Sequence, residues 1–113
     1  MLRSEIWLIS LDPTIGAEIK KTRPVVIVSS DAVGNLPLKV IAPITDWKAH
    51  YIDVPWMVQV QPNQQNGLSK PSCVDTFQVR SVSQERFVRR IGILDANRMK
   101  LVASALAEVL EIE

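Results

Sequence analysis

Prolines divide this 113-residue chain into short segments, and their spacing is the feature that most limits its fold. Proline lacks a backbone donor and interrupts helices. Seven prolines at roughly regular intervals therefore argue against a bundle of long helices. The segments between them are rich in β-branched residues and end in turn sequences such as Asp12-Pro13. This pattern is typical of one small domain, residues 1–113, built from short strands.

We predict six strands, one helical turn and a final helix. The helical turn covers 83–86, and Asp95 is suited to cap a helix over 96–110. That helix has an apolar stripe at spacings of three and four. Its stripe residues are Met99, Val102, Leu106 and Val109, and the strands are expected at 5–11, 24–28, 39–45, 56–60, 73–82 and 87–94. The expected architecture is a small antiparallel barrel or sandwich with one terminal helix.

Alternation within the expected strand 73–82 assigns side chains to two faces. Asp75 and Phe77 would share one face, and Thr76 and Gln78 the other. The run 24–28 is instead continuously apolar, as in a strand buried on both sides. Pro43 lies within the strand 39–45 and suggests an edge or a bulge near its end.

Composition excludes several classes of site. A single cysteine, Cys73, cannot form an internal disulfide, and with a single histidine, His50, it argues against a cysteine or histidine metal site. We therefore predict no metal and no cofactor. No apolar run is long enough to span a membrane, and the N-terminus has no signal-peptide core. These observations predict a cytoplasmic protein that does not bind membranes.

Basic residues gather locally on a chain whose net charge is only +1. Lys20, Lys21 and Arg23 form one cluster, and the segment 80–100 carries a second. Arg23 precedes a proline at the start of the buried run, so it is biased to an extended conformation. A guanidinium held there offers a fork of donors suited to phosphate. The alternative is a surface ion pair or a contact with a backbone carbonyl.

The segment Thr45-Asp46-Trp47 places a hydroxyl, an acceptor and an aromatic face at the end of the third expected strand. Together these groups suit a splayed, single-stranded base. Alternatively, the polar pair shapes a turn and Trp47 covers the edge of the core. Asp46 and Asp75 are both candidate general bases, although a carboxylate in a turn or strand is an unspecific signal.

Several motifs, taken in order, resemble the MazF/PemK family of type II toxin–antitoxin systems. They cover nearly the whole chain, and the series Asp-Pro-Thr, Gly-x-Glu and Thr-Arg-Pro-Val-Val is fairly specific. The matching stretches are Glu5-Ile6-Trp7-Leu8, Leu11-Asp12-Pro13-Thr14, Gly16-Ala17-Glu18, Lys21 to Val28, Ala42-Pro43-Ile44-Thr45 and Gln78-Val79-Arg80.

The resemblance implies an SH3-like antiparallel barrel of the CcdB/PemK type with a short helical turn and a C-terminal helix. It also implies a homodimeric, metal-independent endoribonuclease that cuts single-stranded RNA, often mRNA. The family's catalytic arginine and threonine fall on Arg23 and Thr45. We expect RNA contacts from Glu18, Lys20, Lys21, Asp46, Trp47, Asp75 and Gln78.

The resemblance further implies a cognate antitoxin whose acidic C-terminal segment covers the RNA groove. DNA would be bound only through the antitoxin complex. Two other functions stay open: a CcdB-like protein poison of a topoisomerase, and a catalytically inactive partner that binds antitoxin or DNA. A protein poison does not need the pair Arg23 and Thr45.

One departure from the family concerns the position before Gln78. Many relatives have an acid there, whereas this chain has Phe77, with Asp75 as the nearest acid. Either Asp75 substitutes for the missing acid, or base recognition differs. We expect Phe77 to lie in the core of a dimer rather than to stack on a base.

Overall fold

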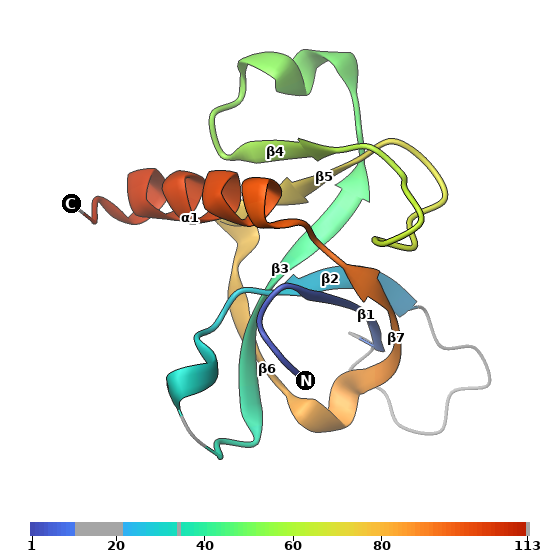
Figure 1. Ribbon diagram of the computed structural model, residues 1–113. Helices are drawn as coiled ribbons and strands as arrows, with labels where there is room; N and C mark the ends of the chain where they lie inside the picture. Colours follow the sequence, from blue (N-terminus) through green and yellow to red (C-terminus); the bar gives the residue numbers. More distant parts are fainter. Residues whose placement is uncertain (11–21, 34, 113) are drawn as a thin grey trace.

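The computed structural model describes residues 1–10, 22–33 and 35–112, which form a mainly antiparallel β structure with one C-terminal helix (Figure 1). The helix α1 spans Ala96–Leu110. Short 3-10 helices connect the strands: η1 (Asp31–Val33), η2 (Ala49–Asp53), η3 (Thr76–Gln78) and η4 (Gln84–Arg86). The strands are β1 (Glu5–Ser10), β2 (Thr22–Ile27), β3 (Leu38–Asp46), β4 (Met57–Val60), β5 (Ser72–Asp75), β6 (Arg80–Ser83) and β7 (Phe87–Ile93).

The strands are hydrogen-bonded in the order β4-β5-β3-β2-β1-β7, and β6 also pairs with β3. All of these pairings are antiparallel. The expected fold class is therefore confirmed. In the part of the chain that the structure describes, the ladder stays open between β4 and β7.

Strands β2 and β3 are buried on both faces, as the apolar run 24–28 predicts. Val25 and Ile27 belong to one apolar cluster, which also contains Ile41, while Val26 belongs to a second cluster together with Ala42. Because neighbouring residues of a strand point to opposite faces, these two strands lie between the clusters. Each fully buried aliphatic side chain contributes about 1.5–3 kcal/mol relative to exposure.

Helix α1 covers one of these clusters and begins where the sequence predicts. The Asp95 carboxylate accepts a hydrogen bond from the Arg98 backbone N–H at 2.7 Å, which caps the helix. Met99 and Val102 are buried in the cluster, and α1 packs beside β4 (Figure 1). Among the described residues, no helix has the length and apolar character needed to cross a bilayer.

The prediction of one strand over 73–82 is wrong, because the turn η3 separates β5 from β6. Val74 pairs with Ile44 and Arg80 pairs with Ile41, so the five residues between Val74 and Arg80 lie opposite only two residues of β3. The single turn η3 takes up the extra residues. The face assignment fails with it: Asp75 is 5% exposed and Phe77 is 61% exposed. Phe77 therefore lies outside the core of the chain.

The connection 61–71 is held against the sheet by a buried asparagine and a close backbone approach. The Asn66 amide donates to the Gln61 carbonyl and accepts from the backbone of Asn63 and Leu68. Gly67 has φ +69°, and a Cβ built on it would lie 2.0 Å from the Ile91 carbonyl oxygen. Only glycine fits at this position without strain.

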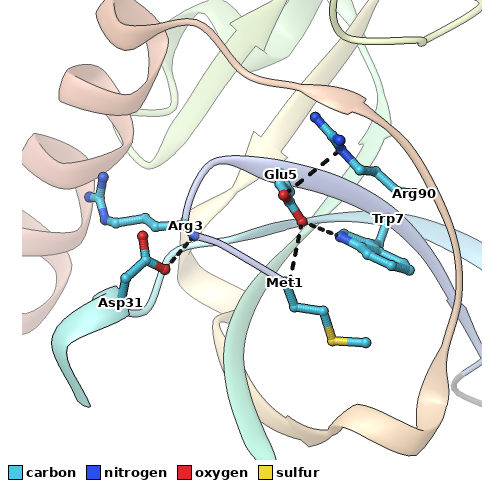
Figure 2. Close-up of polar contacts among 6 residues, drawn as sticks. All are labelled: Met1, Arg3, Glu5, Trp7, Asp31 and Arg90. Carbon is cyan, nitrogen blue, oxygen red and sulfur yellow. Dashed lines mark hydrogen bonds and ion pairs between the residues drawn. The ribbon is translucent and has the colours of Figure 1, made fainter. Parts of the chain in front are cut away.

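Glu5 holds the start of β1 through a cluster of polar contacts (Figure 2). Its carboxylate accepts from the Trp7 indole N–H at 2.9 Å and lies 3.9 Å from both the Met1 ammonium and Arg90 Nε. Burial raises the pKa of Glu5, but the hydrogen bonds from Trp7 and the backbone, together with the two cations, bring it below 4.5. The charged form is therefore the one that the fold stabilises.

We predict that Glu5→Gln lowers the free energy of unfolding by about 1 kcal/mol at neutral pH, since a charge-assisted hydrogen bond is replaced by a neutral one. Because the pKa of Glu5 in the folded protein lies below 4.5, the stabilisation by the Glu5 carboxylate is present above pH 4.5. It is lost as the pH falls through the pKa of the folded state. Urea unfolding across this range measures it, with the exposed Glu85→Gln as the matched control. A difference that persists undiminished near pH 3 would contradict the assignment.

Candidate functional site

Arg23 and Thr45 lie at the ends of the two strands that are buried on both faces. Val25 pairs with Pro43 in the antiparallel ladder between β2 and β3. The ladder ends at this pair, and Arg23 and Thr45 each lie two residues beyond it, where both line the same pockets. The burial of β2 ends at Pro24, and Arg23 is exposed. The fold thus brings together the two residues that the sequence marks as separate candidates.

Two surface pockets meet at this pair, because Arg23, Ile44 and Thr45 line both of them. The central pocket has a volume of about 400 Å³, and the adjacent pocket about 310 Å³. The remaining lining of the central pocket is Ile41, Pro43, Tyr51, Met57, Asp75, Gln78 and Arg80. A chain-like ligand could cross from one pocket to the other and pass Arg23 and Thr45 on the way.

The central pocket combines two guanidinium groups with hydrogen-bonding side chains. Arg23 and Arg80 supply positive charge, and Thr45 supplies a hydroxyl. Asp75 and Gln78 lie beside them, joined by a hydrogen bond of 2.8 Å from Gln78 Nε2 to Asp75 Oδ2. Two arginines next to hydroxyl and amide groups suit a phosphodiester flanked by bases.

The adjacent pocket contains an exposed ion pair. Lys70 Nζ lies 3.1 Å from Asp46 Oδ1, and both side chains are more than half exposed. Such a pair contributes little to stability. A phosphate can therefore replace Asp46 as the partner of Lys70 at small cost.

Aromatic side chains border the central pocket on one side. Tyr51 lines it from η2 and makes edge-on contacts with Trp47 and His50, at centroid distances of 6.0 and 4.6 Å. Trp47 is half-buried and lines neither pocket. Tyr51, rather than Trp47, is therefore the ring that faces the central pocket.

Cys73 pairs with Thr45 across the sheet but is buried. Burial, followed by the nearby carboxylates of Asp75 and Asp46, raises the pKa of the Cys73 thiol to about 11. The thiol keeps its proton at neutral pH and is a poor nucleophile. Cys73 is thus a structural residue.

The structure brings together five of the nine residues that the sequence singles out. Arg23, Thr45, Asp46, Asp75 and Gln78 line the two pockets. Glu18, Lys20 and Lys21 lie outside the described residues, and Trp47 stands behind Tyr51.

Among the further lining residues, Tyr51, Lys70 and Arg80 offer a ring or a positive charge and were not selected from the sequence. Arg80 belongs to the basic segment 80–100 and to the Gln-x-Arg stretch, which could have identified it. Tyr51 and Lys70 carry no comparable local signal. Across the described ranges, no three histidine, cysteine, aspartate or glutamate side chains are grouped as a metal site.

Comparison with known families gives one match that covers almost the whole chain. The model of the "PemK-like, MazF-like toxin of type II toxin-antitoxin system" family matches residues 2–110. Among curated proteins, the chain is 30% identical to the endoribonuclease MazF9 of Mycobacterium tuberculosis over 112 residues. This alignment covers 94% of the chain and 92% of that protein.

Solved structures of toxins share the fold. The Mycobacterium tuberculosis toxin MazF-mt6 has a TM-score of 0.77 and 26% identity, covering 96% of this chain and 98% of that one. An endoribonuclease in complex with its cognate antitoxin, from a Mycobacterial species, has a TM-score of 0.79 and 18% identity, covering 100% and 97%.

Proposed function

Because this chain belongs to the PemK-like, MazF-like family of type II toxin–antitoxin toxins, we propose that it is an endoribonuclease that cleaves single-stranded RNA between its two pockets. The observation that carries this proposal is the meeting of both pockets at Arg23 and Thr45. A single strand passing through both pockets presents one phosphodiester to this pair. The proposed substrate is messenger RNA, and the activity is therefore expected in the cytoplasm.

Cleavage proceeds without a metal, through attack of the RNA's own 2′-hydroxyl on the adjacent phosphorus. The 5′-oxygen leaves, and the products carry a 2′,3′-cyclic phosphate and a 5′-hydroxyl. Negative charge builds up on the non-bridging oxygens in the transition state. Arg23 stabilises this charge with fixed, bidentate donors, and it does not carry protons because arginine stays protonated.

Thr45 lines both pockets together with Arg23, which supports a role in holding the reacting group. Its hydroxyl both donates and accepts hydrogen bonds, so it can orient the phosphate or the 2′-hydroxyl and relay a proton through water. Arg80 and Lys70 hold flanking phosphates, one in each pocket, and Tyr51 stacks on a base beside the cleaved bond. We extend the RNA surface to Glu18, Lys20, Lys21, Asp46 and Trp47 as a part of the same proposal.

We predict that Arg23→Ala and Thr45→Ala each lower the rate of RNA cleavage by about 10²–10³, the usual effect of removing one group that stabilises transition-state charge. The measurement is cleavage of a long single-stranded RNA in EDTA, with both product ends mapped. Wild-type protein should give 5′-hydroxyl ends in the presence of the chelator.

Arg89→Ala is the matched control, because Arg89 is an exposed arginine on β7 that lines neither pocket. It should cleave like wild type. Cleavage by Arg23→Ala at the wild-type rate would reject the site. A folded wild-type protein that leaves RNA intact would point to a poison of a protein target or to an inactive partner.

The second part of the proposal is a cognate antitoxin with an acidic, extended segment. The related structure of an endoribonuclease with its cognate antitoxin supports such a partner. The pockets at Arg23 and Arg80 provide complementary charge, and Lys20 and Lys21 precede Arg23 in the sequence. Antitoxin bound there excludes RNA by occupying the same surface.

We predict that antitoxin affinity falls about tenfold or more between about 0.1 and 1 M salt, over which the screening length shortens from about 10 to about 3 Å. Titration calorimetry with the full antitoxin measures this dependence. An affinity that does not change with salt would show that the interface is apolar instead.

The third part is a homodimer formed through the exposed side of α1. Leu101 is 49% exposed there and lines a pocket with Pro55, Ala105 and Glu108. An apolar pocket of about 230 Å³ lies beside it, lined by Pro55, Trp56, Phe77, Ala105, Glu108 and Val109. Exposed apolar surface of this kind is typical of protein interfaces.

We predict a dimer at micromolar concentration by sedimentation velocity, and a monomer for Leu101→Asp, because a carboxylate would be desolvated at the interface. Val88→Asp is the matched control, since Val88 is an exposed apolar residue on β7. A monomeric wild-type chain would reject the dimer, and a dimeric Leu101→Asp would reject this interface.

A further inference from the structure

Asp75 is an acidic residue of the central pocket whose two oxygens both have protein partners. Oδ1 accepts from the Phe77 backbone N–H at 3.1 Å, and Oδ2 accepts from Gln78 Nε2 at 2.8 Å. The residue is 5% exposed. Its first contact caps the turn η3, and its second fixes the side chain of Gln78.

The second contact determines which way the Gln78 amide faces. A carboxylate only accepts hydrogen bonds, whereas an amide has a donor end and an acceptor end. The NH₂ group of Gln78 must therefore face Asp75, which leaves Oε1 to accept from a ligand and one N–H to donate. Gln78 is exposed and lines the central pocket with Asp75. A ligand in this pocket thus meets a carbonyl oxygen of fixed orientation.

We propose that Asp75 is a positioning residue that makes Gln78 select adenine or cytosine over guanine or uracil at one position of the RNA. This inference rests on the proposed ribonuclease function. Adenine N6 and cytosine N4 are amino groups that donate to Oε1. In a base held at the same place, guanine O6 and uracil O4 are acceptors and leave Oε1 facing another lone pair. Guanine N1–H or uracil N3–H would reach Oε1 only after the base shifts along its edge.

The same contacts explain the departure from the family at Phe77. An acid directly before Gln78 would occupy a position that is 61% exposed here. Asp75, two residues before Phe77, instead accepts a hydrogen bond from the amide of Gln78. In this proposal Asp75 acts through Gln78.

Asp75→Asn tests the orientation with little change in shape. Asparagine caps helices as well as aspartate does, so its oxygen still accepts from Phe77 N–H. Its NH₂ group then faces Gln78, which must turn Oε1 inward and present NH₂ to the RNA. The double variant Asp75→Asn/Gln78→Glu again presents an acceptor to the RNA. One oxygen of the carboxylate introduced at position 78 accepts from the amide introduced at position 75, and the other oxygen faces the pocket.

The experiment maps the cleavage sites of wild type and variants on one long single-stranded RNA. It then compares kcat/KM on oligonucleotides that differ at one base. We expect wild type to prefer adenine or cytosine at one position by about tenfold, Asp75→Asn to move the preference to guanine or uracil, and the double variant to restore it. Asp95→Asn makes the same substitution at the cap of α1 and should keep the wild-type preference.

The outcomes separate this inference from the proposed function. A wild-type protein that cleaves no RNA overturns both. Cleavage with the same base preference in wild type and Asp75→Asn overturns the inference alone. Where Asp75→Asn cleaves no RNA, Gln78→Leu decides: loss of discrimination at one position supports the inference, and unchanged discrimination at every position overturns it.

Discussion

Burial of β2 and β3 on both faces controls the geometry of everything around the candidate site. Val25 and Ile27 pack into one apolar cluster while Val26 packs into the other, so neither strand can slip by one residue without moving every side chain to the wrong face. This requirement fixes the register of β2 on β3, and Arg23 and Thr45 follow two residues after the last pair, Val25 with Pro43. Polar residues follow where the apolar clusters end, and the two pockets open there.

The features that could be predicted from the sequence are those set by neighbouring residues. The apolar run 24–28 indicates a strand buried on both sides, and Asp95 indicates the first turn of α1. Arg23 and Thr45 could also be found, since each stands at the end of an apolar strand. Their meeting in space depends on the pairing of β2 with β3, which lies outside either segment.

The features that could not be predicted arise from pairings between distant segments. Residues 73–82 alternate like a strand, but β3 requires η3 between Val74 and Arg80, and this turn exposes Phe77. Tyr51 and Lys70 reach the pockets from connections whose paths depend on the rest of the sheet. The part of the candidate surface contributed by these connections therefore required the structure.

The buried position of Asn66 has a consequence for chemical ageing. In a flexible chain, an Asn-Gly sequence deamidates readily, because the glycine nitrogen can attack the side-chain amide and close a succinimide ring. Here that amide is engaged by Gln61, Asn63 and Leu68, and the residue is 1% exposed. Closing the ring would require all three hydrogen bonds to break. Folding thus protects Asn66, the residue at which the unfolded chain would deamidate fastest.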